Sequence, residues 1–255
     1  MTTCIIQARM GSSRFPGKVL KKVDQNDLSI LSTIKQIKNS KKIHNIIIAT
    51  TTLSEDKKII NYLKKTKIDV EVFTGNPKNV LDRYYKCAKK FSCESIVRVT
   101  ADCPLIDPKI LDKGINIFNK GSLDYVTNTF PRTYPDGNET EIFSFEALTR
   151  AWKNAKLPSE KEHVTPYFRN YPNKFKIKNF TFKKDISNLR WTVDYPEDLK
   201  LVKLLISKIN HRPIHLEHIL EILKLEPKLI EINKGHFPNE GYLKSLNDDK
   251  KLLKK

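Results

Sequence analysis

The residues with the clearest chemical potential lie near the start of the chain, where an apolar segment runs into a polar, basic loop. Residues 4–8 predict a short buried strand, and residues 9–18 follow with glycines, hydroxyl groups and three cations. In open α/β folds, a loop of this kind places backbone N–H groups and basic side chains at the carboxyl edge of the sheet, where phosphorylated ligands bind. The loop therefore predicts a triphosphate site, with a polar surface turn as the alternative.

Two acidic residues follow predicted strands in a similar way. Asp102 comes shortly after the apolar run 95–99, and Asp194 ends the predicted strand 189–194; a proline follows each acid by two positions. If both strands are parallel and central, both carboxylates lie at the same sheet edge as the basic loop. Mg²⁺ takes one or two protein carboxylates and completes its coordination with phosphate oxygens and water. Asp102 and Asp194 are therefore candidate Mg²⁺ ligands, and the alternative is that each caps the following helix.

Strands and helices alternate through the first half of the chain. The apolar runs and their spacing predict strands over residues 4–8, 43–50, 70–73, 95–99 and 124–127. Between them they predict helices over residues 28–37, from residue 54, over 79–91 and over 108–118. This alternation predicts βαβ units and an α/β fold, with a mainly parallel sheet and helices on both of its faces.

The alternation weakens after residue 131. There we expect a helix over residues 143–155, an edge or hairpin strand over 175–182 and a further strand over 189–194. Two more helices are expected over residues 196–209 and 216–225, followed by a polar tail. The chain is accordingly divided into a main domain of residues 1–210 and a C-terminal helical extension and tail of residues 211–255.

The composition of the chain indicates which partners and which cellular compartment to expect. The 255 residues carry a net charge of +18, but the lysines are spread over nearly every segment, so biased composition explains the charge better than a nucleic-acid interface does. No stretch reaches the roughly 18 to 20 apolar residues of a membrane span, and the first strand begins too early for a secretory signal. We therefore expect a cytoplasmic protein with no nucleic-acid or membrane partner. The cysteines lack paired spacing and are expected to be reduced thiols: Cys4, Cys87, Cys93 and Cys103.

Three motifs taken together resemble one enzyme family. They are Arg-x-Gly-Ser-Ser-Arg-x-Pro-x-Lys at residues 9–18, Ala-Asp-Cys-Pro-Leu at 101–105 and Val-Asp-Tyr-Pro-Glu-Asp at 193–198. The set resembles the cytidylyltransferases that activate sugar acids as CMP conjugates, and it is most similar to the branch of spore coat polysaccharide biosynthesis protein F. Segments at residues 135–148, 162–167 and 239–246 are also similar to that branch, so the resemblance covers essentially the whole chain.

The resemblance implies a nucleotidyltransferase domain over residues 1–210 with a Rossmann-like, glycosyltransferase-A-type sheet. It implies CTP, an acidic small-molecule acceptor and Mg²⁺, with pyrophosphate as the leaving group and a homodimer as the assembly. The implied nucleotide contacts are Ala8, Arg9, Met10, Gly11, Ser12, Ser13, Arg14, Lys18, Asp82, Arg83, Thr100 and Asp102. The implied catalytic residues are Arg14, Lys18 and Asp102, the implied Mg²⁺ ligands Asp102 and Asp194, and the implied acceptor contacts Glu141, His163 and Arg190. For Asp82 and Arg83 the alternative is a solvated helix face, and for His163 it is a structural role.

Several departures leave the acceptor open. The sugar-acid synthetases typically have Pro, Lys and Asn where this chain has Gln7, Arg14 and Val19, and the segment beyond residue 209 has no counterpart that we can place in them. A phosphonate or a phosphorylated small molecule is therefore an alternative acceptor. A glycosyltransferase that uses a finished nucleotide sugar is a second alternative, but its expected Asp-x-Asp metal motif is absent between the predicted strands. A nonenzymatic anion-binding protein is a third, and it would cluster basic residues with exposed aromatic ones.

Overall fold

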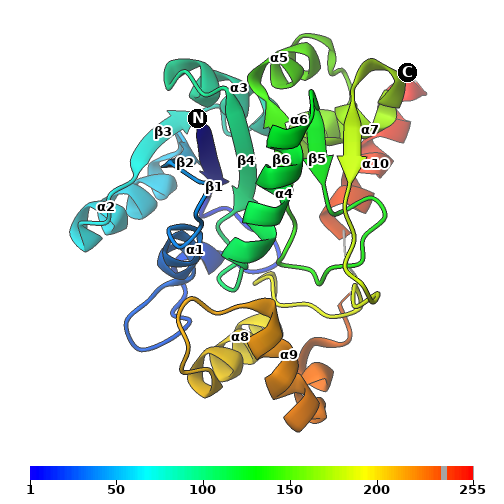
Figure 1. Ribbon diagram of the computed structural model, residues 1–255. Coiled ribbons are helices and arrows are strands. Elements are labelled where there is room, and N and C mark those ends of the chain that lie inside the picture. The colour runs from blue at the N-terminus through cyan, green and yellow to red at the C-terminus, as the bar shows by residue number, and fades with distance from the viewer. Residues whose placement is uncertain (237–239, 255) are drawn as a thin grey trace.

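The computed structural model describes residues 1–236 and 240–254 of the chain (Figure 1). In this described part, seven strands form one sheet in the order β3-β2-β1-β4-β6-β5-β7. The strands are β1 (Thr2–Gln7), β2 (Asn45–Thr51), β3 (Glu71–Gly75), β4 (Ser95–Thr100), β5 (Tyr125–Thr127), β6 (Glu141–Ser144) and β7 (Ile177–Asn179). β1 to β4 run parallel, so their carboxyl ends share one edge, whereas β6 runs antiparallel to β4 and β5. The predicted mainly parallel sheet is confirmed.

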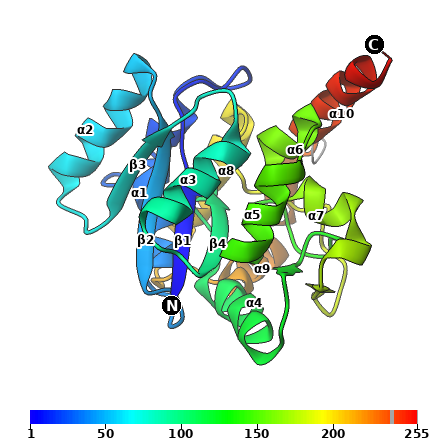
Figure 2. The same ribbon diagram turned by 90° about the horizontal axis from the view of Figure 1, so that it is seen from above.

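Helices cover both faces of the sheet, as Figures 1 and 2 show. The apolar core on one face includes residues of α1 (Ser29–Ile37), α2 (Lys57–Thr66), α4 (Pro108–Lys120) and α8 (Pro196–Lys208). The core on the other face includes residues of α3 (Val80–Lys90), α5 (Phe145–Asn154) and α7 (Pro166–Asn170). β1 serves both cores, because alternate side chains of a strand point to opposite faces: Ile6 joins the first core and Ile5 the second. The predicted fold class is therefore confirmed.

Two predicted strands and one predicted helix differ from the structure. The prediction of a strand over residues 189–194 is wrong, because this segment pairs with loops instead of the sheet. Arg190 makes an isolated bridge to Asp136, and the N–H of Val193 bonds to the carbonyl of Asp102 at 2.8 Å. Residues 143–144, predicted as helix, belong to β6, and α5 begins only at Phe145. The predicted edge strand 175–182 is reduced to the short β7.

The C-terminal region is largely helical. α9 (Leu216–Leu225) forms as predicted and, with the 3₁₀ helix η4 (Pro227–Asn233), packs near α8. α10 (Glu240–Leu253) packs against α6 (Pro158–His163), so the expected polar tail is wrong for these residues. One reason is that the buried Asp249 accepts the backbone N–H of Ser159 at 2.9 Å and thereby caps α6. Asn239, the first residue of the motif 239–246, lies outside the described residues.

The remaining expectations about composition concern membranes and thiols. No helix in the described residues has both the length and the apolar character needed to span a membrane. The four cysteines are buried and form no disulfide, as predicted. Burial raises the pKa of the Cys103 thiol well above its ordinary value, and the neighbouring Asp102 charge acts in the same direction. Both effects disfavour the thiolate, which is the reactive form of cysteine.

Candidate active site

The basic loop after β1 is fixed by hydrogen bonds at both of its ends. Asp56, which is buried just after β2, accepts the backbone N–H of Met10 at 2.6 Å and the hydroxyl of Thr51. At the far end, Gly17 adopts a left-handed φ of 68° and donates its N–H to the carbonyl of Met10 at 3.0 Å. Glycine takes this conformation without steric cost. The loop is therefore closed just before Lys18, the first residue of the 3₁₀ helix η1 (Lys18–Leu20).

Lys18 lies between the two predicted metal ligands. Its ammonium contacts Oδ2 of Asp102 and lies 2.5 Å from Oδ1 of Asp194, and all three side chains are largely buried. Burial opposes the charge on Lys18, but the two carboxylates outweigh it and raise the pKa of the ammonium. Burial also opposes the charge on Asp102, yet Lys18 holds the pKa of that carboxyl below its ordinary value. Asp102 and Lys18 are thus both charged in a poorly solvated site.

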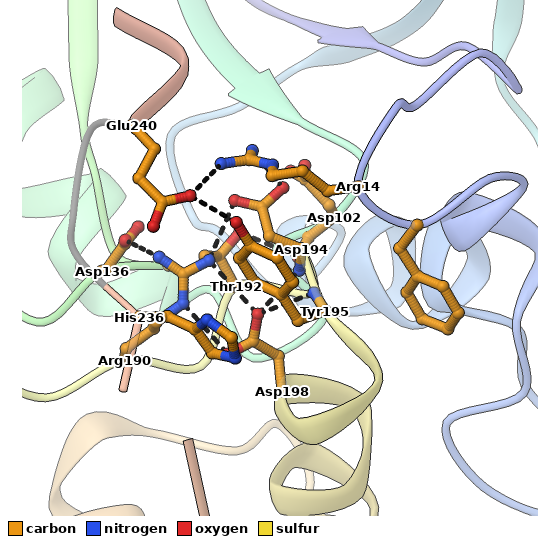
Figure 3. A network of polar contacts seen from close by, with 12 residues as sticks. Arg14, Asp102, Asp136, Arg190, Thr192, Asp194, Tyr195, Asp198, His236 and Glu240 are labelled. Carbon is orange, nitrogen blue, oxygen red and sulfur yellow. Dashed lines mark hydrogen bonds and ion pairs between the residues drawn. The ribbon is translucent and has the colours of Figure 1, made fainter. Parts of the chain in front are cut away.

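Two arginines complete the surroundings of Asp194 (Figure 3). Nη2 of Arg14 lies 2.7 Å from Oδ1 of Asp194, and Nη2 of Arg190 lies 2.9 Å from Oδ2. The backbone N–H of Asp194 also bonds to Asp198, one of two acids in the first turn of α8, at 2.9 Å. Asp194 therefore contacts both Arg14 and Lys18, and Lys18 in turn contacts Asp102, so the structure brings these four residues together; their roles remain predictions.

Arg190 is the centre of a buried ion-pair network. Besides Asp194, its guanidinium contacts Asp198 at 3.0 Å and Asp136 at 2.7 Å. Burial lowers the tendency of Arg190 to be charged, but these carboxylates outweigh it and raise its pKa. Burial and the nearby Glu139 raise the pKa of Asp136 well above its ordinary value, although Arg190 acts against this. The role in acceptor binding that the resemblance implies for Arg190 remains a prediction, because its guanidinium already meets three carboxylates.

The other predicted acceptor contacts, Glu141 and His163, have internal partners. Glu141 is buried in β6 and forms an ion pair with Arg98 at 2.5 Å. Burial alone would raise the pKa of Glu141, but the Arg98 charge outweighs it and lowers this pKa. Nε2 of His163, at the end of α6, lies 3.0 Å from the Ser245 hydroxyl of α10. Burial and then the Arg98 charge lower the pKa of His163 to about 4, so the ring is neutral at pH 7. Their acceptor roles remain predictions.

The remaining predicted nucleotide contacts are spread along the carboxyl edge of the sheet and α3. Asp82 accepts Trp152 Nε1 at 3.0 Å, and Arg83 donates to the carbonyl of Asn76 at 2.9 Å. Asp82 and Arg83 are buried, so the alternative of a solvated helix face is wrong. Arg9 forms an ion pair with Glu162 at 3.0 Å. Thr100 is the last residue of β4, and Ala8 is buried just after β1. The loop itself contains the other predicted contacts, Met10, Gly11, Ser12 and Ser13.

Sequence reasoning missed several residues of the site. Tyr195 donates its hydroxyl to Glu240 of α10, and its ring stacks on His236 with a centroid distance of 3.8 Å. Glu240 also lies 3.3 Å from Nη1 of Arg14. Asn233 donates to Asp198 at 2.8 Å and so links η4 to the Arg190 network. Only the resemblance of residues 239–246 to the family marked Glu240 as noteworthy, because no local pattern connects the tail with residue 14.

The carboxylates of Asp102 and Asp194 can be compared with the ligands that the predicted Mg²⁺ requires. Asp102 and Asp194 already converge on one cation, the Lys18 ammonium, so their oxygens point toward a shared position. In the described residues, no group of three or more His, Cys, Asp or Glu side chains is arranged for a metal ion. The two carboxylates fit Mg²⁺ in its usual nucleotide setting, where phosphates and water supply the remaining ligands and Lys18 would give up its place.

The topology and the position of the site define a class of enzymes. A basic loop and convergent acids at the carboxyl edge of a mainly parallel sheet are typical of Rossmann-like nucleotidyltransferases. The structure of CMP:2-keto-3-deoxy-manno-octonic acid synthetase complexed with CTP has this fold: it matches 81% of this chain and 98% of its own, with a TM-score of 0.63 and 16% identity. At that identity the likeness concerns the fold alone.

The sequence relationship is closer and specifies the family. The cytidylyltransferase family matches residues 3–233, and the chain belongs to that family, whose members are CTP-dependent nucleotidyltransferases. The spore coat polysaccharide biosynthesis protein SpsF of Bacillus subtilis is 32% identical over 234 residues, which are 88% of this chain and 94% of that protein. The structure of a cytidylyltransferase from Leptospira borgpetersenii is 35% identical, with a TM-score of 0.84 over 90% of this chain and 96% of its own. The predicted family and enzyme class are confirmed.

Proposed function

We propose that the protein transfers CMP from CTP to a sugar acid and releases pyrophosphate, in the synthesis of surface polysaccharide or glycoconjugate precursors. The observation that carries the proposal is the convergence of Arg14 and Lys18 on Asp102 and Asp194. The name of the Bacillus relative supports a role in polysaccharide synthesis. A sugar-acid acceptor is supported by the 3-deoxy-manno-octulosonate cytidylyltransferase of Geobacter sulfurreducens, which is 28% identical over 113 residues, or 44% of this chain and 43% of that protein.

The chemistry assigned to the site is an in-line displacement. An acceptor oxygen forms a bond to the α-phosphorus of CTP, and the bond from that phosphorus to the bridging oxygen breaks, so pyrophosphate leaves with the electron pair. Negative charge gathers on the nonbridging and leaving oxygens, and positioning and electrostatic stabilisation supply most of the catalysis. A carboxylate or phosphate acceptor needs no general base, whereas a sugar hydroxyl has to lose its proton.

The residues divide these tasks by charge. Arg14 and Lys18 neutralise the departing pyrophosphate; Arg14 grips two oxygens through its fork, and Lys18 acts as a point charge. Asp102 and Asp194 would hold Mg²⁺, while Arg190 and Asp198 keep Asp194 oriented. Mg²⁺ held by these two carboxylates would supply electrostatic stabilisation of the negative charge that develops during the transfer. The proposal includes a homodimer, which the family resemblance implies, and a cytoplasmic location, which is the expectation from the sequence.

Pyrophosphate release tests the proposal. CTP, ATP, GTP and UTP are each incubated with Mg²⁺ and a panel of sugar acids, phosphonates and phosphorylated small molecules. We expect release with CTP and a sugar acid, together with an equal amount of a CMP conjugate detected by mass. Release only with a phosphonate or phosphorylated acceptor would replace the sugar acid in the proposal. Transfer of sugar from a nucleotide sugar, without pyrophosphate release from CTP, would instead support a glycosyltransferase.

A further inference from the structure

The first residue of α10 places a carboxylate on the cation assigned to the triphosphate. Glu240 Oε2 lies 3.3 Å from Nη1 of Arg14 and accepts the hydroxyl proton of Tyr195, as Figure 3 shows. The other guanidinium nitrogen of Arg14 lies 2.7 Å from Asp194, in the predicted reactive centre. The Arg14 guanidinium also lies over the Tyr195 ring, 5.5 Å from its centroid. A residue from the far end of the chain is thus bound directly to the nucleotide loop.

The rest of α10 is anchored on α6. Ser245 contacts His163 Nε2 at 3.0 Å, and Asp249 accepts the N–H of Ser159 at 2.9 Å. The ring of Tyr242 packs edge-on against His163, with 5.3 Å between centroids. α10 therefore joins the nucleotide loop to α6 through a few polar contacts. Glu240, the first residue of α10, connects the helix to the nucleotide loop through Arg14 and to the segment before α8 through Tyr195.

Nη1 of Arg14 cannot bind the Glu240 carboxylate and a triphosphate oxygen at the same time without bringing two negative charges together. A phosphate oxygen brought to Nη1 of Arg14 lies next to the Glu240 carboxylate, and two like charges about 4 Å apart repel enough in water to change an equilibrium about fivefold. We propose that Glu240 is an internal competitor for the triphosphate: it occupies Arg14 in the nucleotide-free enzyme, gives way to CTP, and thereby loosens α10. The inference rests on the proposed CTP site. Because Ser245 contacts His163, loosening of α10 also uncovers this predicted acceptor residue after the nucleotide has bound.

Matched substitutions on α10 test the competition. Glu240→Gln removes the charge with little change in shape, Glu240→Ala removes the side chain, and Asp248→Asn removes a charge from the same helix. Asp248 is a suitable control because its side chain is half exposed and, among the described residues, forms its ion pair with Lys251 of the same helix, at 3.0 Å. CTP and CMP are titrated calorimetrically into each full-length variant. We expect both Glu240 variants to bind CTP about threefold to tenfold more tightly, with CMP affinity changed less than about twofold and Asp248→Asn unchanged.

Hydrogen exchange of the α10 amides supplies a second readout. In the wild-type protein, CTP should accelerate exchange in α10 and CMP should not, whereas Glu240→Gln should exchange rapidly without nucleotide. Unchanged or weaker CTP binding in both Glu240 variants would overturn the inference, and so would slower exchange of α10 with CTP. If wild-type protein binds no CTP while Glu240→Gln still exchanges rapidly, the proposed function has failed, and the competitor role fails with it. Wild-type binding of CTP with no effect at Glu240 overturns only the competitor role.

Discussion

Lys18 and Asp194 are separated by 176 positions in the sequence, yet the Lys18 ammonium lies 2.5 Å from Oδ1 of Asp194. The same ammonium contacts Asp102, so one cation holds together the loop after β1, the turn after β4 and the segment before α8. In the nucleotide-free state, Lys18 thus compensates two carboxylates that would otherwise face each other in a buried site. Lys18 therefore contributes both to the stability of the site and to its proposed chemistry.

Lys18→Met should destabilise the protein at pH 7 by about 3 kcal/mol, because breaking a buried ion pair leaves an uncompensated charge. Lys18 lowers the folded-state pKa of Asp102, and its loss should raise that pKa above the unfolded value. The destabilisation should therefore be present at neutral pH and should shrink as the pH falls through the raised pKa. Urea unfolding at several pH values measures this. The double variant Lys18→Met with Asp102→Asn should recover most of the loss; no recovery would contradict the pairing.

Asp102→Asn and Asp194→Asn should each reduce turnover by about 100-fold or more, because loss of a carboxylate removes a ligand that a hard cation needs. The measurement is pyrophosphate release as a function of Mg²⁺ concentration. Asp185→Asn is the matched control, because the Asp185 side chain is exposed and accepts hydrogen bonds from Ser187, two positions away. Near-normal activity of Asp194→Asn at saturating Mg²⁺ would reduce Asp194 to a partner of Arg190 and Lys18.

Arg190→Ala should lower the free energy of unfolding by about 3 to 5 kcal/mol, since it leaves buried carboxylates without their cation. The fork of Arg190 meets Asp136, Asp194 and Asp198, so Arg190→Lys should recover only part of the loss. Urea unfolding of both variants provides the comparison. A fully stable Arg190→Lys protein with a raised KM for the acceptor would favour the acceptor-binding role implied by the family resemblance.

His163 should make the folded state sensitive to mild acid. Its folded-state pKa of about 4 lies below the unfolded value of about 6.5, so the unfolded chain binds more protons between these values. Stability should therefore fall as the pH drops from about 6.5 to about 4, by on the order of 2 kcal/mol from this residue. His163→Gln, which cannot titrate but can still bond to Ser245, should show a flatter pH dependence in unfolding experiments. Identical slopes for both proteins would contradict the buried neutral ring.

The alternating half of the fold could be predicted because its signals are local. The apolar run that becomes β4 and the amphipathic α4 specify their own structure, and the carboxyl edge of parallel strands then locates Asp102 near Lys18. The segment 189–194 misled the prediction because its apolar residues are buried without being in the sheet. Trp191 and Val193 are fully buried, but the backbone of this segment bonds to Asp136 and Asp102.

The parts of the site that could not be predicted depend on distant contacts. β6 is a short antiparallel strand, and only its pairing with β4 and β5 distinguishes it from the start of α5. Glu240 reaches Arg14 across 226 positions, and nothing in the residues around either of them encodes that meeting. The buried network of Arg190 likewise exists only once three segments have folded together.

Crystals of the protein grown with CTP and Mn²⁺ test the assignment of the active site most directly, because anomalous scattering locates the metal independently of the protein atoms. We expect the metal on Asp102 and Asp194, the triphosphate along the loop after β1, and Lys18 moved from between the carboxylates to the β- or γ-phosphate. A triphosphate bound away from this loop, with Lys18 still between Asp102 and Asp194 and no metal beside them, would contradict the assignment.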